Sequence, residues 1–193
     1  MTGLFKGISW KSRLIIFLSW RLKKYSHASE INDFSGEQIE AWMTGGKHWW
    51  SGKVRWNKSY HVGHTPGTRI DLYRFIGIRA DQEEGIWKFL VKQVGKEYDW
   101  HGIWGFVRRK LTENPLKWFC SELVFSAYAH EGLVLLKNIL PCQVTPPTLV
   151  TSPLYEYVGF LIVGEDLDQL GKVPVSQIAK KNKMIEERDA RSL

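Results

Sequence analysis

Three short segments rich in β-forming residues, separated by turn-forming residues, constrain the fold more than any other feature of this sequence. They are YSHASEIN (residues 25–32), EQIEAWM (37–43) and RIDLYRFIGI (69–78). Segments of this length, bounded by Gly, Asn, Asp and Ser, are typical of antiparallel strands. A fourth segment, LYEYVGFLIVG (154–164), has the apolar, β-branched and aromatic composition of a buried strand. The pattern therefore predicts a mostly antiparallel sheet.

Two stretches have the pattern of helices that could pack against such a sheet. Residues 81–95 begin with acidic side chains and end at a glycine, and residues 119–132 end in the same way. The apolar positions at helical spacing are Ile86, Phe89, Leu90 and Val94 in the first stretch and Leu123, Val124, Ala127 and Tyr128 in the second. Together with the strands they predict an α+β fold, and 193 residues fit one domain.

The domain is expected to span residues 1–165. Within it, residues 45–67 are rich in Gly and aromatic residues and predict a long loop beside a substrate cleft. Residues 141–153 form a Pro-rich connector to the last strand. The remaining residues, 166–193, are polar and charged, which predicts a solvated helix or a frayed tail.

The charge balance is basic, with 27 Lys and Arg against 20 Asp and Glu and a net charge of +7. The basic residues do not form a stripe interleaved with aromatic residues, which binding of single-stranded nucleic acid would need. Nucleic acid is therefore not an expected partner. Residues 9–24 predict a basic amphipathic helix that either packs on the domain or lies on an anionic membrane surface.

The apolar run of residues 14–20 is short and has no cleavage motif after it, so it is not interpreted as a signal peptide. No segment has the ~20 apolar residues that a transmembrane helix needs. Two cysteines outside any CxxC motif do not suggest a disulfide scaffold. These features favour a cytoplasmic location.

Cys120 lies in the first turn of the helix predicted for residues 119–132. Free backbone N–H groups and the positive end of the helix dipole stabilise a thiolate there and can also bind an oxyanion. A lone cysteine before an apolar helical run is also a common small core residue. A catalytic interpretation therefore requires a base nearby.

His27 and Glu40 are candidates for that base and its orienting group. They lie on consecutive predicted strands, thirteen residues apart, so that a hairpin can place both side chains on one face. A thiol commonly uses a histidine as its base, and a polar neighbour fixes the tautomer of that histidine. The alternative is a strand histidine that is only hydrogen-bonded or exposed.

Three further histidines lie in residues 45–67. His48, His61 and His64 include an H-x-x-H pair, which is chemically adequate for zinc, but their spacing is loose and ordinary exposed histidines are the favoured interpretation. No metal and no cofactor are expected. The tryptophans of the same loop, Trp49, Trp50 and Trp56, either pack on the sheet or form an aromatic wall for substrate.

Several segments together resemble the permuted relatives of NlpC-type cell-wall peptidases, which include YiiX-like and lecithin:retinol acyltransferase-like enzymes. YSHASEI resembles the family's first strand, QIEAW the next strand with its acidic residue, GKEYDW the segment before the cysteine, and FCSELV the nucleophile helix. TPPTLVTSP resembles the usual close, and the order His, acidic residue, Cys is the permuted one. The resemblance implies a circularly permuted papain-like fold over about residues 9–163.

The resemblance also implies roles for particular residues. Cys120 would be the nucleophile, His27 the general base and then acid, and Glu40 the group that holds His27. Tyr98 would line the site, and the oxyanion donors would be the backbone N–H of Cys120 and of its neighbour Ser121.

Two residues compete for these roles. Glu30 lies close to His27 on the same strand and is a rival orienting group. His61, in SYHVGH, resembles the start of the family's first strand and is a rival base, although no matching acidic segment follows it.

The expected chemistry is thiolate attack on an amide or ester to give an acyl-enzyme. The substrate favoured by the resemblance is a peptide or isopeptide, such as a bacterial cell-wall peptide. Two alternatives remain open: a lipid-directed acyltransferase or acyl hydrolase at a membrane surface, and a non-catalytic structural or adaptor module of the phage or prophage type.

Overall fold

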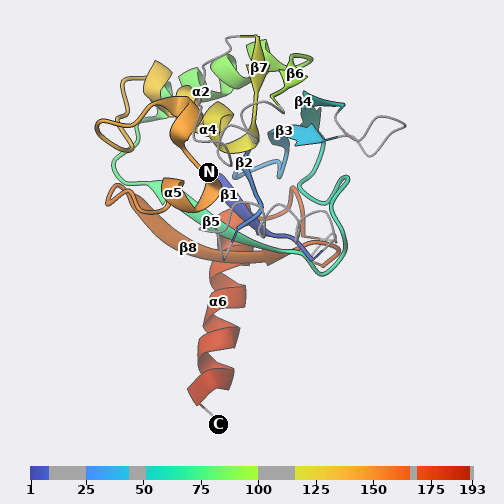
Figure 1. Ribbon diagram of the computed structural model, residues 1–193. Helices are drawn as coiled ribbons and strands as arrows, with labels where there is room; N and C mark the ends of the chain where they lie inside the picture. The colour runs from blue at the N-terminus through green and yellow to red at the C-terminus, as the bar shows by residue number, and fades with distance from the viewer. Residues whose placement is uncertain (9–24, 44–50, 100–115, 166–168, 192–193) are drawn as a thin grey trace.

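The computed structural model of the protein describes residues 1–8, 25–43, 51–99, 116–165 and 169–191, which form an α+β structure (Figure 1). The described residues contain one mixed sheet of eight strands in the order β7-β6-β4-β3-β2-β1-β5-β8. The strands are β1 (Thr2–Lys6), β2 (His27–Ile31), β3 (Gln38–Met43), β4 (Gly52–Asn57), β5 (Arg69–Phe75), β6 (Glu97–Tyr98), β7 (Lys117–Trp118) and β8 (Tyr155–Ile162). Only the β6–β7 pair is parallel in this sheet.

The helices of the described residues are α2 (Ala80–Gln93), α4 (Cys120–His130), the single turn α5 (Pro146–Leu149) and α6 (Val175–Arg191), with a 3₁₀ turn η1 (Pro141–Gln143). The two helices predicted from apolar spacing correspond to α2 and α4. The turns η1 and α5 fall in the segment expected to be a connector, where prolines occupy the first helical positions and have no backbone N–H that would need a partner there.

The four predicted strands correspond to β2, β3, β5 and β8, but the prediction of one uninterrupted loop over residues 45–67 is wrong. β4 lies within it and pairs along its whole length with β3, from Gln38↔Asn57 to Met43↔Gly52. Charged residues at Lys53 and Arg55 hid this strand, because only Val54 and Asn57 in it are buried. β1 was also not predicted, although it fills the centre of the sheet between β2 and β5.

Helices α2 and α4 pack together on one side of the sheet, above β2 and β3 in Figure 1. All four apolar residues predicted to face inward from α4 are buried, in one core cluster with Ala28, Ile39 and Ala41 of the sheet. In the first helix Ile86 and Leu90 are buried, whereas Val94 is exposed because the helix ends at Gln93.

Helix α6 packs its first turns against β8, so the expectation of a fully solvated segment is wrong for its start. Val175, Ile178 and Ala179 join a second core cluster with residues of β8 such as Leu161. Gly159 of β8 makes this contact possible, because a Cβ at that position would overlap the backbone of Ala179. Beyond Ala179 the helix is largely exposed and extends away from the sheet (Figure 1).

The amphipathic helix predicted for residues 9–24 lies outside the described residues, as do His48, Trp49 and Trp50. Trp56 of β4 is half exposed. Among the helices that are described, none combines the length and the apolar character needed to span a bilayer.

Candidate active site

Cys120 is the first residue of α4. The helix begins there because Phe119 has an extended backbone and its N–H donates to Glu122 Oε2 across 3.4 Å. The next residue, Ser121, donates its hydroxyl to the carbonyl oxygen of Val144 across 2.7 Å. The start of the helix is therefore held from both sides, and the Cys120 thiol is almost fully buried.

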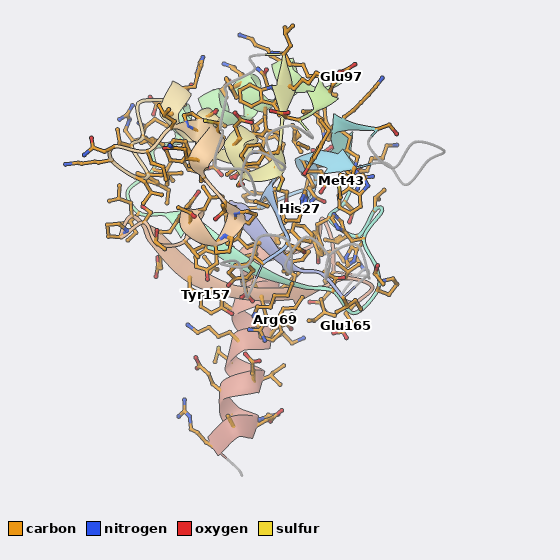
Figure 2. All side chains as sticks on the ribbon, in the orientation of Figure 1. His27, Met43, Arg69, Glu97, Tyr157 and Glu165 are labelled. Carbon is orange, nitrogen blue, oxygen red and sulfur yellow. The ribbon has the colours of Figure 1, made fainter. Side chains whose placement is uncertain are left out.

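His27 is the first residue of β2 and lies in the interior of the molecule (Figure 2). Its Nε2 lies 2.5 Å from Glu40 Oε2, and the Cys120 thiol is near enough to raise the pKa of the ring. Since Nε2 faces Glu40, Nδ1 is the ring nitrogen left for Cys120. The imidazole thus bridges a thiol and a carboxylate contributed by three separate elements.

Glu40 is fully buried and saturated with hydrogen bonds. Its Oε1 accepts from Arg55 Nε (2.8 Å), Arg55 Nη2 (2.6 Å) and Asn57 Nδ2 (2.7 Å). Its Oε2 accepts from Gln38 Nε2 at 2.9 Å in addition to its contact with His27. Strand geometry explains the arrangement, because alternate residues share a face and the register pairs Glu40 with Arg55 and Gln38 with Asn57.

The electrostatics of the three groups are mutually reinforcing. Burial alone would raise the pKa of Cys120, but the charge and hydrogen bond of His27, with the backbone N–H groups of Ala28 and Ser121, lower it below its usual range. Burial alone would lower the pKa of His27, but Cys120 and Glu40 raise it to about 9. Burial alone would raise the pKa of Glu40, but the hydrogen bonds and charges of His27 and His64 together hold it well below its usual range. All three shifts favour the ionised forms, which are thiolate, imidazolium and carboxylate.

Tyr98 of β6 also contacts the nucleophile candidate. It is buried, and burial together with the nearby Cys120 charge raises its pKa far above the usual value. The phenol is therefore a neutral donor beside the sulfur. The sequence placed Tyr98 at the site only through the family resemblance.

His64 is a fourth group at the same place, and the interpretation of it as an ordinary exposed histidine is wrong. Its side chain is 4% exposed, and its Nε2 lies 3.2 Å from Glu40 Oε2. Its ring stacks on Phe5 with centroids 4.3 Å apart and meets the edge of Trp42 at 4.7 Å. Burial lowers the pKa of His64, so this ring is neutral beside the charged pair.

A small cavity of about 90 Å³ opens beside the two histidines. It is lined by Phe5, His27, Trp42 and His64 among others. Its walls come from β1, β2 and β3 and from the loop after β4, so it borders the imidazole on the side away from the helix core.

The two rival residues have other partners. Glu30 lies on the opposite face of β2 from His27, since the two are an odd number of residues apart, and accepts from Thr2 (3.0 Å) and Tyr128 (3.2 Å). His61 accepts a hydrogen bond at Nδ1 from the backbone N–H of Gly164 across 2.8 Å and stacks on Tyr60. The structure brings His27, Glu40 and Cys120 together, whereas these contacts hold Glu30 and His61 elsewhere.

Sequence reasoning missed four residues that complete the site: Gln38, Arg55, Asn57 and His64. A signal existed for three of them, because Q-x-E in β3 and R-x-N in β4 place polar side chains on alternate positions of paired strands. His64 lies in a loop, and only tertiary contacts reveal its place.

The arrangement can supply a nucleophilic thiolate, a general acid–base and a fixed orientation for both. Histidine and carboxylate donor atoms of His27, Glu40 and His64 also lie within 4.8 Å of one another, which is a spacing that could hold a metal ion. The chain matches no protein-family model, and a comparison with curated proteins finds no relative.

Proposed function

We propose that this protein is a cysteine hydrolase with a circularly permuted papain-like fold, and that it cleaves an amide bond through an acyl-enzyme. The observation that carries the proposal is the bridging position of His27 between Glu40 Oε2 and the Cys120 thiol. The order of the three residues along the chain and the sheet packed on the Cys120 helix are compatible with the permuted fold.

In the proposed first step, the Cys120 thiolate attacks the carbonyl carbon of the scissile amide. The negative charge that develops on the carbonyl oxygen is stabilised by backbone N–H groups in the first turn of α4, the positive end of the helix dipole. His27, protonated through its raised pKa, donates its proton to the leaving amine, and a thioester remains on Cys120.

In the second step, neutral His27 removes a proton from water, which attacks the thioester carbonyl. Collapse of this intermediate releases the carboxylic acid and returns the sulfur as thiolate and the imidazole as imidazolium. Glu40 acts throughout by holding the ring through Nε2 and stabilising its positive charge. Its own position is fixed by Arg55 and Asn57, so the ring has one orientation.

The proposed substrate class is a peptide or isopeptide, with cell-wall peptide as the leading candidate on the basis of the family resemblance. The net charge of +7 is compatible with an anionic polymer. Neither Cys120 nor Cys142 is in a disulfide, which is compatible with a reducing compartment, and we propose a cytoplasmic location.

The experiment that tests the proposal is the pH dependence of Cys120 alkylation by iodoacetamide, with Cys142→Ser in every variant to remove the second thiol. The parent is expected to react as a thiolate well below the ordinary thiol pKa of ~8.5. His27→Ala is expected to shift the profile upward towards that value. His61→Ala is the matched control and is expected to leave the profile unchanged.

An ordinary thiol profile in the parent, or a depressed one that is indifferent to His27, would contradict the proposal. In that case the non-catalytic alternative, a structural or adaptor module that retains the fold, would be favoured. A depressed profile that depends on His27 justifies a screen against peptide, isopeptide and ester substrates.

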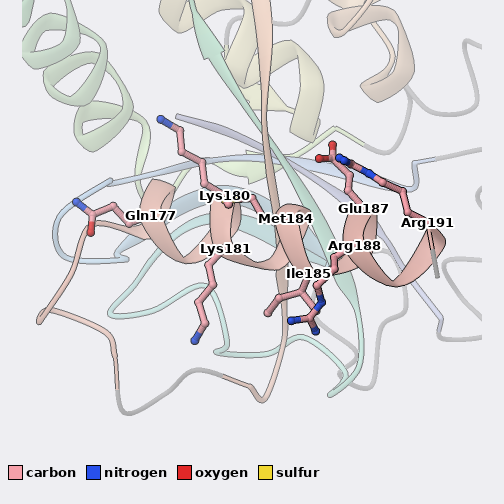
Figure 3. Close-up of a pocket in the computed structure, with 8 residues that line it drawn as sticks. All are labelled: Gln177, Lys180, Lys181, Met184, Ile185, Glu187, Arg188 and Arg191. Atoms are coloured by element: carbon pink, nitrogen blue, oxygen red, sulfur yellow. The ribbon is translucent and has the colours of Figure 1, made fainter.

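A second candidate function, a lipid-directed acyl hydrolase or acyltransferase, is favoured by the exposed face of α6. Figure 3 shows the hollow along this face, where Met184 and Ile185 lie among Lys180, Lys181 and Arg188. Met184 is 69% exposed. Apolar side chains flanked by basic ones are typical of helices that lie on anionic membranes.

Vesicle flotation separates the two candidates. With vesicles of phosphatidylglycerol, the lipid-directed candidate requires binding that Lys180→Glu with Lys181→Glu abolishes. Neutral phosphatidylcholine vesicles are the control, and equal flotation of parent and variant, or none, would count against this candidate.

A further inference from the structure

The cluster of His27, Glu40 and His64 contains more ligand chemistry than a cysteine hydrolase uses. His64 plays no part in the proposed mechanism, yet its Nε2 is directed to within 3.2 Å of Glu40 Oε2. Two imidazoles and one carboxylate are also the protein ligands of many zinc sites that leave one position for water. The cluster therefore has two uses, and only one of them needs Cys120.

We propose that His27 Nε2, Glu40 Oε2 and His64 Nε2 form a zinc-binding site, and that zinc at this site inhibits the enzyme. The three donor atoms lie within 4.8 Å of one another. Ligands at about 2.0–2.2 Å from a tetrahedral zinc are roughly 3.3 Å apart. The distance of 3.2 Å between Glu40 Oε2 and His64 Nε2 already meets that requirement.

The remaining donor needs only a small movement. His27 Nε2 lies 2.5 Å from Glu40 Oε2 and would separate from it by less than about 1 Å as the ion replaces the hydrogen bond, while its distance from the His64 donor, within 4.8 Å, would shorten towards roughly 3.3 Å. His27 is the first residue of β2, and its imidazole borders the cavity of about 90 Å³, which gives the ring room to move. The same space admits a water molecule as fourth ligand.

The groups around the ligands have the arrangement of a second coordination shell. Arg55 and Asn57 donate only to Oε1 of Glu40, so they fix the carboxylate and leave Oε2 for the ion. Phe5 and Trp42 pack on the His64 ring and fix its plane.

Gln38 is the one donor that points into the proposed site. Its Nε2 lies 2.9 Å from Glu40 Oε2 and 3.3 Å from His64 Nε2, while its Oε1 is buried and has no hydrogen-bond partner among the described residues. Rotation of the Gln38 side-chain amide by half a turn exchanges the positions of Nε2 and Oε1. The oxygen then faces the ion, so the residue that would oppose a cation becomes an additional oxygen ligand.

Zinc is expected to inhibit the enzyme because it coordinates Nε2 of the catalytic His27. This expectation of inhibition rests on the proposed function. A ring coordinated through Nε2 keeps its Nδ1–H beside the Cys120 sulfur, but it cannot give up that proton to a leaving amine without becoming a zinc-bound imidazolate. General acid–base catalysis by His27 is therefore blocked, although the sulfur is not a ligand itself. Binding, in contrast, does not depend on the thiol.

The test is a titration with zinc ion alone against a chromogenic chelator, using the full chain with Cys120→Ser and Cys142→Ser. One equivalent is expected to bind. His64→Gln in this background is expected to weaken the affinity on the order of 100-fold. His61→Gln, which alters a histidine three residues away whose Nδ1 accepts from Gly164, is the matched control and is expected to bind as the parent does.

Two results would overturn the proposal: loss of zinc binding when both cysteines are replaced, or equal affinity in the parent and in His64→Gln. Cobalt provides a second measurement if His64→Gln does not fold. The chain with both cysteines is expected to give ligand-field absorption without a thiolate charge-transfer band, and such a band would place the metal on sulfur and refute the site.

The functional consequence is measured separately, as turnover at neutral pH of the peptide or isopeptide substrate identified in the screen, with and without zinc. Slower turnover that chelator reverses is expected, and unchanged turnover at saturating zinc would refute inhibition. If the metal-free profile shows an ordinary thiol, the proposed hydrolase function fails while the titration still decides the metal site.

Discussion

His27 Nε2 lies 2.5 Å from Glu40 Oε2, and the carboxylate that it meets is held by Arg55 and Asn57 through the other oxygen. The imidazole is therefore attached to an immobile, fully ionised group on one side and faces the Cys120 thiol on the other. Orientation and charge of the ring are both set before any substrate arrives.

Glu40→Gln is expected to lower amide hydrolysis on the order of 100-fold or more, because the imidazolium loses the charge that stabilises it. The pKa of His27 should fall and that of Cys120 should rise, since each is set by the other. Alkylation and turnover against pH measure both effects. Glu84→Gln, at an exposed position of α2, is the control, and an equal loss there would argue against a specific role for Glu40.

Activity is expected to have a bell-shaped pH dependence. The lower limb follows the depressed pKa of Cys120, because the thiol must be ionised, and the upper limb follows the pKa of His27 near 9, because the leaving amine needs its proton. The two values belong to the coupled pair rather than to either residue. A profile of kcat/KM measures them, and activity that continues to rise above pH 9 would disagree with a protonated His27.

Arg55→Met is expected to destabilise the fold by about 1–3 kcal/mol, because two hydrogen bonds to the buried Glu40 carboxylate are lost. The guanidinium also lies over the Trp42 ring, 4.4 Å from its centroid. Arg55→Lys keeps the charge but not the planar fork, so it should recover stability only in part. Urea denaturation compares the variants, and a full recovery by lysine would show that the charge alone matters.

Gly159→Ala is expected to cost about 3 kcal/mol of unfolding free energy, because its Cβ would overlap the Ala179 backbone and displace α6. Gly77→Ala is the matched control. Gly77 has a φ of +75° in an exposed turn and nothing near its Cβ position, so only backbone strain of about 1–2 kcal/mol is expected. Equal losses in the two variants would mean that the α6 contact contributes little.

The local patterns in the sequence predicted much of the fold. Strands β2, β3, β5 and β8 and helices α2 and α4 were all predicted, because each has a periodic apolar pattern that local geometry alone explains. The same reasoning failed for β1 and β4 and for the two-residue strands β6 and β7. β4 exposes charged residues, and it forms a strand because it pairs with β3. No local pattern in the sequence predicts that pairing.

The residues of the candidate site also fall into those that the sequence predicts and those that only the tertiary structure reveals. Residue types and their positions on predicted elements made Cys120, His27 and Glu40 candidates, because a helix N-terminus and a hairpin are local structures, and the family resemblance joined them into one group. The contacts of His64, Arg55 and Asn57 with one carboxylate were decided only by the tertiary structure. Hydrogen bonds to a buried charge join residues from different strands and loops, and the need to satisfy that charge selects among arrangements that the sequence alone leaves equivalent.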